Sequence, residues 1–120
     1  MVQQGELKTA EERFEAAVIL VENDEPADLK LAEVLAQEAA TGGEPLAPRV
    51  AAEAIDKQRV LAHEPQRYGT QYEWVAVLRE WRLYSLDPNT TDSERRAMGV
   101  PPLAEIYEIE KKLNAGKPAR

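Results

Sequence analysis

A polar run of six residues divides this chain into two parts with different hydrophobic patterns. The run, from Gln66 to Gln71, holds two carboxamides, a guanidinium, a phenol and a hydroxyl around one glycine. Before it, apolar residues recur every three or four positions, which is the period of an α-helix. After it, aromatic and β-branched residues recur nearer every second position, as in a β-strand. The chain is therefore expected to have an α+β fold that is mostly α.

The part before the polar run predicts three helices, at about 9–22, 26–40 and 47–63. Thr9 and Glu12 have the spacing of a capping box, in which each side chain accepts from a backbone N–H of the other. Pro26 suits the first turn of a helix, where its missing N–H removes no hydrogen bond. In the first helix we expect a broad buried stripe, made of Phe14, Ala17, Val18, Ile19, Leu20 and Val21.

The part after the polar run predicts a small antiparallel β-hairpin and then two short helices. The strands are expected at about 71–78 and 81–86, turning near Arg79 and Glu80. One helix over 71–83 is the alternative, because Trp74, Val77 and Trp81 also match helical spacing. The two last helices are expected to open at Thr91, by a second capping box, and at about residue 103.

Composition restricts the chemistry that this chain can perform. At 120 residues it fits a single domain, with 1–8 and 115–120 expected to be flexible. It has no cysteine and one histidine, His63, so we expect no metal site and no cofactor. The net charge of −7 argues against nucleic acid as a partner. Without a long apolar segment or a secretion signal, the expected location is cytoplasmic, without membrane contact.

From the third helix onward the chain resembles a family of uncharacterised bacterial domains. The resemblance rests on Ala52 and Asp56, on Pro65 to Gln71, on Asp87, and on Arg95 to Leu103. It covers about half of the chain, and Tyr-Gly-Thr-Gln is its most specific piece. Lys57 stands where the family pattern has arginine, and Glu22 stands where such domains often carry a histidine. The resemblance implies a site but names no reaction.

These residues give a candidate site around the polar run. The catalytic candidates are Asp56, Tyr68 and Glu22, with a carboxylate as base and the phenol as acid or donor. The substrate-binding candidates offer amide, hydroxyl or guanidinium groups, and they are Gln66, Arg67, Thr70, Gln71, Arg95 and Arg96.

The surroundings of Asp56 leave structural alternatives open. Asp56, Arg59 and His63 fall within one arc of the third helix. This arc is either a charged functional site or a solvated face of the helix. Asp56 is expected to accept hydrogen bonds from Tyr68 or Thr70, or to form an ion pair with Arg95 or Arg96. The polar run itself is a pocket wall, or else a structural loop that holds the hairpin against the third helix.

Two functions are compatible with this sequence. The first is a polar pocket that binds a small molecule or peptide, with metal-independent acid–base action on that ligand as a further hypothesis. The alternative is a non-catalytic protein–protein interaction domain, in which the polar run is structural and the aromatic hairpin contacts the partner. Because an isolated hairpin is marginally stable, a homodimer that extends the sheet is also compatible with the sequence.

Overall fold

The computed structural model describes residues 9–115 and shows five helices and a two-stranded antiparallel sheet within them. Three helices come first: α1 (Ala10–Leu20), α2 (Pro26–Thr41) and α3 (Ala47–Leu61). The hairpin of β1 (Tyr72–Val75) and β2 (Glu80–Leu83) follows, and then α4 (Asp92–Ala97) and α5 (Leu103–Asn114). The α+β fold, mostly α, and the order of its elements are confirmed. The flexibility expected for 1–8 and 115–120 concerns residues that, apart from Ala115, lie outside this described part.

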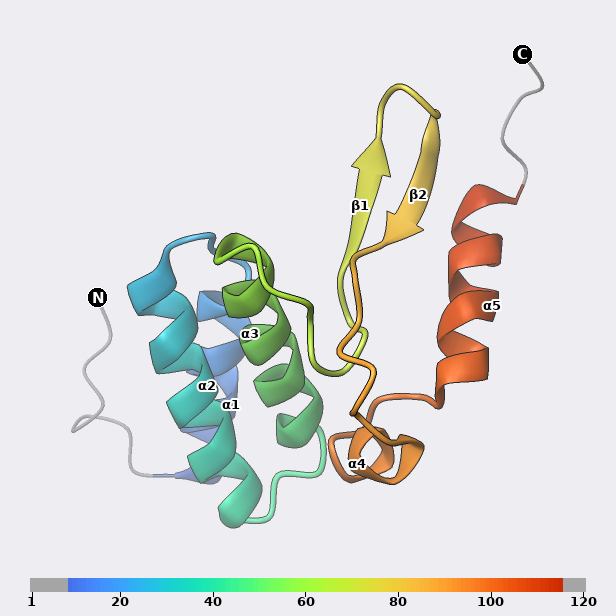
Figure 1. Cartoon of the computed structure of the whole chain (residues 1–120). Coiled ribbons are helices and arrows are strands. Elements are labelled where there is room, and N and C mark those ends of the chain that lie inside the picture. Colours follow the sequence, from blue (N-terminus) through green and yellow to red (C-terminus); the bar gives the residue numbers. More distant parts are fainter. Residues whose placement is uncertain (1–8, 116–120) are drawn as a thin grey trace.

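The helices α1, α2 and α3 pack around a core rich in alanine (Figure 1). Leu29 and Leu35 of α2 are fully buried at its centre. The capping box at Thr9 is confirmed. The broad stripe expected on α1 is wrong, because Val18 is 38% exposed and Ile19 is 69% exposed. Small side chains bring the helices close together, so a narrow face of α1 is enough to cover α2.

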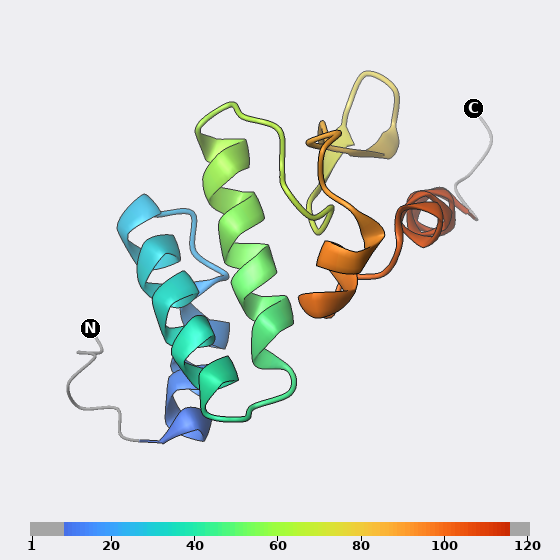
Figure 2. The same cartoon turned by 60° about the horizontal axis from the view of Figure 1, so that its bottom comes forward.

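Helix α3 lies between the two halves of the molecule (Figure 2). Val50, Ala51 and Ala54 face α1 and α2 and belong to the first core. Ala52, about half a turn away, belongs to a second core with Tyr68, Val100 and Ile106. The helix is therefore buried on two sides, and its polar residues other than the buried Asp56 occur along the two boundaries between those sides.

The hairpin is confirmed, and the single helix over 71–83 is not what forms. Tyr72 pairs with Leu83 and Trp74 pairs with Trp81, which places these four side chains on one face. The strands are shorter than expected, because a four-residue turn over 76–79 replaces the expected turn near Arg79 and Glu80. Arg79 adopts a left-handed φ of 51° in that turn.

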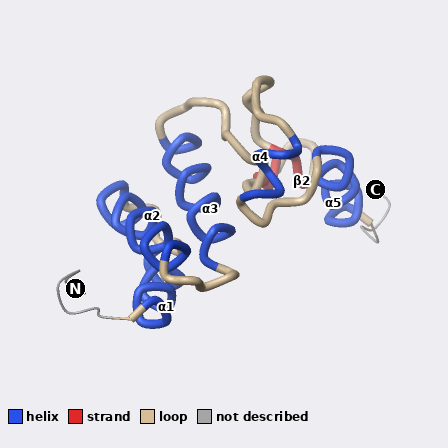
Figure 3. Tube along the Cα trace, turned by 90° about the horizontal axis from the view of Figure 1, so that it is seen from below, coloured by secondary structure: helices blue, strands red, loops and turns tan. Residues whose placement is uncertain are grey.

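Side chains of α5 take the place of a third strand beside β2. The Asn114 carboxamide accepts from Trp81 N at 2.7 Å and donates to Trp81 O at 2.9 Å. Glu110 accepts from Leu83 N at 2.6 Å. The backbone of β2 therefore has partners on both of its edges, and the hairpin is fixed to α5. Seen from below, the hairpin, α4 and α5 lie across α3 from α1 and α2 (Figure 3).

Asp92 connects the last two helices. Its Oδ1 atom accepts from Leu103 N, at the start of α5, and from Arg95 Nη1, both at 2.9 Å. The hydrogen bond from Leu103 N and then the interaction with Arg95 lower the pKa of Asp92 below its ordinary value. No helix within residues 9–115 has the length and apolar character needed to cross a membrane.

We predict that the stability of the protein falls in acid in part through Asp92. A carboxylate whose pKa is lowered by folding stabilises the folded state at pH values above its pKa in the unfolded chain. That contribution is lost as the pH falls through the lowered pKa of the folded state. Asp92→Asn should therefore be less stable than wild type at pH 7, and the difference should shrink as the pH approaches 2. Urea unfolding across this pH range measures it, and a difference that is constant with pH would contradict the assignment.

Candidate functional site

Asp56 lies on α3 beneath the loop that connects this helix to β1. Its Oδ1 atom accepts from Arg67 N at 2.8 Å and Tyr68 N at 2.9 Å. Its Oδ2 atom accepts from Gly69 N at 3.1 Å, from Thr70 N at 3.0 Å and from the Thr70 hydroxyl at 2.7 Å. The side chain is fully buried. One carboxylate therefore binds four consecutive backbone N–H groups and one hydroxyl.

These contacts fill the acceptor capacity of the Asp56 carboxylate. A carboxylate offers about four lone-pair positions, and five donors point at this one. The hydrogen bonds expected from Tyr68 and Thr70 to Asp56 are confirmed. Tyr68 donates through its backbone N–H, and Thr70 donates through both its backbone N–H and its hydroxyl. The catalytic role proposed for Asp56 stays a prediction, and its contacts support a structural role instead.

Gln66 is a second buried polar residue of the loop, and it closes the base of the hairpin. Its side-chain Nε2 donates to Gln71 O at 2.9 Å and to Tyr84 O at 3.1 Å. Its Oε1 accepts from Gln71 N at 2.9 Å. Its backbone pairs with Ser85 O and Asp87 N. The carboxamide therefore satisfies backbone groups on both sides of the hairpin, as the structural alternative for this loop expects.

The centre of the loop is packed against the C-terminal half of the molecule. Gly69 has a φ of +106°, and a Cβ atom there would lie 2.8 Å from the Ile106 side chain. Glycine is required at this position for both its backbone conformation and its lack of a side chain. Tyr68 is 6% exposed, and its carbonyl accepts from Arg95 Nε at 3.0 Å. Arg95 is itself 3% exposed, so it fixes the loop to α4.

The remaining two arginines of the candidate set, Arg67 and Arg96, lie in different surroundings. Arg67 donates to Glu94 at 3.2 Å, and its guanidinium lies over the Tyr68 ring at 5.3 Å from the centroid. Arg96 follows Arg95 on α4, so it points about 100° away from the loop, and it is exposed. The structure therefore gathers Arg67 and Arg95 at the loop and leaves Arg96 apart.

Glu22 and Gln71, by contrast, line the same cavity. It lies at the boundary between α3, the end of α1 and the end of the loop, and its volume is about 180 Å³. Val21, Glu53 and Lys57 complete its lining. This cavity brings together one catalytic candidate and one binding candidate that are far apart in the sequence.

Lys57 is held in place by its three donors. Its ammonium donates to Val21 O at 2.9 Å and to Asn23 O at 3.1 Å, and lies 3.3 Å from the Asp24 carboxylate. Val21 is the C-cap of α1, so the ammonium satisfies carbonyls at the negative end of that helix. Lys57 is thus a fixed positive charge on the cavity wall.

Glu53 is the carboxyl group of this cavity whose protonation is most perturbed. Burial raises the pKa of Glu53 above its ordinary value, Arg49 opposes that rise, and the negative charges of Glu22 and Asp56 add to it. Its side chain is 35% exposed. A carboxyl group whose pKa is raised in this way, next to a second carboxyl group in one cavity lining, is a candidate for proton exchange with a ligand.

A second cavity, of about 270 Å³, shares Lys57 and Gln71 with the first. Its wall includes the half-buried rings of Tyr72 and Tyr84. Burial raises the pKa of Tyr72 and of Tyr84, with a further rise from Glu110 and Glu73 respectively. At neutral pH these phenols are therefore neutral groups, and Tyr72 donates to Ile106 O at 3.2 Å.

Sequence reasoning missed Glu53 as a site residue and treated Lys57 only as a departure from a family pattern. Their spacing of four residues places them on one face of α3, which was a detectable signal. The arc expected for Asp56, Arg59 and His63 does not form. His63 lies beyond the end of α3 with a φ of 60°, where the chain closes with Glu64 N donating to Arg59 O at 2.8 Å.

Comparison of the chain with protein-family models, curated proteins and solved structures found no match. The resemblance to uncharacterised bacterial domains therefore stays a prediction. Among residues 9–115, no group of three or more histidine, cysteine and acidic side chains is placed to hold a metal ion.

We predict that Asp56→Asn lowers the free energy of unfolding by about 3 kcal/mol or more. An asparagine would remove the charge that the backbone N–H groups bind and would turn an amide donor toward some of them. Urea unfolding measures the loss. The control is Glu15→Gln, at an exposed position of α1, which should change stability by less than about 0.5 kcal/mol. A loss below about 1 kcal/mol at Asp56 would contradict the structural role assigned to it.

Proposed function

We propose that this protein binds a small polar molecule or peptide end in the two cavities that share Lys57 and Gln71. We further propose that the Glu53 carboxyl group, which lines the cavity beside Glu22, exchanges a proton with that ligand. The observation that carries the proposal is the meeting of Glu22, Glu53, Lys57 and Gln71 in one cavity lining. Taken together, the two cavities fall within the size range of small-ligand sites, roughly 300–1000 Å³.

The contacts already made within the cavity indicate which ligand fits it. The three Lys57 donors are used by α1 and Asp24, and the Gln71 amide nitrogen donates to the Thr70 hydroxyl at 3.0 Å. The groups that remain to bind a ligand are mainly acceptors, the carboxylates of Glu22 and Glu53. A ligand with hydroxyl or ammonium donors therefore complements the cavity. Glu53 is the group proposed to move a proton, because its raised pKa lies nearer neutral pH.

We predict that a ligand of this class raises the melting temperature of wild type and fails to do so in Gln71→Ala. Binding to the folded state alone stabilises it by mass action, so thermal shift detects it. The screen would use polyols, primary amines and amino acids at millimolar concentration. Gln37→Ala, on the α2 surface, is the matched control and should keep the response. A compound whose shift is equal in wild type and in Gln71→Ala would exclude this cavity as its site.

The aromatic hairpin supports a second candidate function, which is self-association. Trp74 and Trp81 form an edge-to-face pair with ring centroids 5.6 Å apart, yet Trp74 is 48% exposed and Trp81 is 37% exposed. At the turn Val77 is 86% exposed and Leu78 is 45% exposed. This apolar face continues the half-buried face formed by Tyr72 and Leu83, which pack against the second core. A second copy of the chain, with the same face, would extend that burial across a two-fold contact.

We predict that wild type forms dimers as its concentration rises from micromolar to about millimolar, and that Trp74→Thr weakens the dimer about tenfold. Sedimentation velocity measures both. Ile19→Ser, which removes an exposed apolar side chain from α1, is the control and should dimerise as wild type does. A wild-type protein that is monomeric throughout this range would rule out self-association through the hairpin.

A further inference from the structure

A further cavity lies at the boundary on the opposite face of α3 from Glu53 and Lys57. Its volume is about 440 Å³, and it opens between α2, α3 and the loop between α3 and β1. Gln58, Arg59 and Arg67 give its lining polar groups, and Ile55 and Ala62 add apolar surface. It shares no lining residue with the two cavities of the proposed function.

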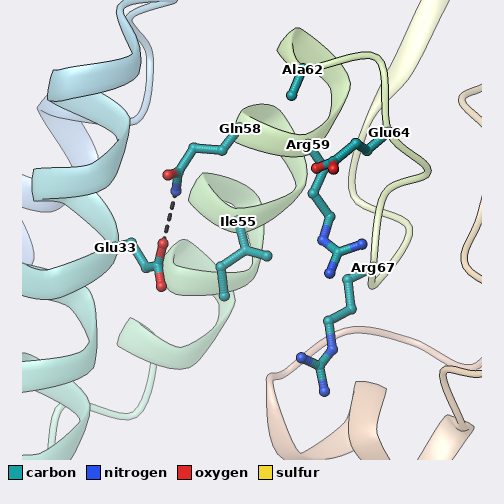
Figure 4. Close-up of a pocket in the computed structure, with 7 residues that line it drawn as sticks. All are labelled: Glu33, Ile55, Gln58, Arg59, Ala62, Glu64 and Arg67. Carbon is teal, nitrogen blue, oxygen red and sulfur yellow. Dashed lines mark hydrogen bonds between the residues drawn. The ribbon is translucent and has the colours of Figure 1, made fainter.

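Two guanidinium groups lie along one wall of this cavity (Figure 4). Arg59 donates one N–H to Pro65 O at 3.3 Å, and Arg67 donates one to Glu94 at 3.2 Å. A guanidinium carries five N–H donors in a planar fork, so each of these has donors beyond those contacts. Two positive groups that line the same cavity repel each other, and an anion bound between them would remove that repulsion.

Two acidic residues, Glu33 and Glu64, also belong to the lining of this cavity. Glu33 stands on α2, across Ile55, where the Gln58 carboxamide donates to it at 2.8 Å and Lys30 lies 3.7 Å away (Figure 4). Glu64 is exposed and lies beyond Arg59 in this view. The two guanidinium groups therefore share this cavity lining with the apolar Ile55, and the acid on α2, Glu33, already has its own partners.

We propose that this cavity is a binding site for a carboxylate group, which Arg59 and Arg67 bind through their planar forks. A carboxylate matches the geometry of a guanidinium fork, and its short hydrocarbon part would lie on Ile55 and Ala62. The net charge of −7 and the two acids at the rim favour a singly charged ligand over a polyphosphate. The carboxylate belongs to a small free acid or to the C-terminus of a peptide.

The test is a titration of the full chain at constant ionic strength, followed by the arginine Nε–Hε signals in NMR spectra. The probes are sodium propionate, the dipeptide acetyl-Ala-Ala, and the same dipeptide with a C-terminal amide. We expect saturable shifts of the Arg59 and Arg67 signals with propionate or with the free dipeptide, and no response to the amide. Propionate binding indicates a free acid, and binding of the free dipeptide alone indicates a peptide end.

Two variants and a control connect the response to this cavity. Arg59→Gln should weaken binding at least about tenfold, because it removes one of the two forks. Arg59→Lys keeps the charge but loses the fork, so it should also bind more weakly, and it serves if the first variant does not fold. Arg82→Gln, on the exposed side of β2, should bind as wild type. The proposal is overturned if no probe gives saturable shifts, if the amide binds equally well, or if Arg59 variants bind unchanged.

Discussion

The carboxylate of Asp56 is the interaction on which the arrangement of both halves depends. Burying an ionised carboxylate without partners costs several kcal/mol, and here five donors surround it. Four of these donors are consecutive backbone N–H groups, so the charge fixes the course of the loop. The loop in turn holds the hairpin through Gln66 and α4 through Arg95. One side chain of α3 therefore positions most of the C-terminal half of the molecule.

This arrangement separates the structural polar groups from those proposed to bind ligands. The structural groups, Asp56 and Gln66, are fully buried and bonded to backbone. The cavities lie instead along the two boundaries of α3, where its partly exposed side chains meet α1 on one face and α2 on the other. Glu53 and Lys57 line one boundary, and Arg59 lines the other. A helix that is buried on two opposite sides leaves only these boundaries for its partly exposed polar side chains, whereas the buried Asp56 is fully bonded to the loop.

Much of the fold could be predicted from the sequence because its signals are local. The capping boxes at Thr9 and Thr91 depend on a few neighbouring residues, and both are present. The exposure of Ile19 could not be predicted in this way, since it depends on how closely alanine-rich helices approach. Nor could the sequence show whether Asp56 faces a ligand or backbone N–H groups. That difference is set by the path of a loop eleven or more residues further along the chain.

The most direct test of the role of Asp56 is amide hydrogen exchange at residues 67–70, measured by NMR. If the buried Asp56 carboxylate binds these four N–H groups, they should exchange only through global unfolding, as slowly as amides in the middle of α3. In Asp56→Asn the same four amides should lose that protection before the helices do. Amides at 67–70 that exchange in the wild-type protein as fast as those of an exposed loop would contradict the central role of Asp56.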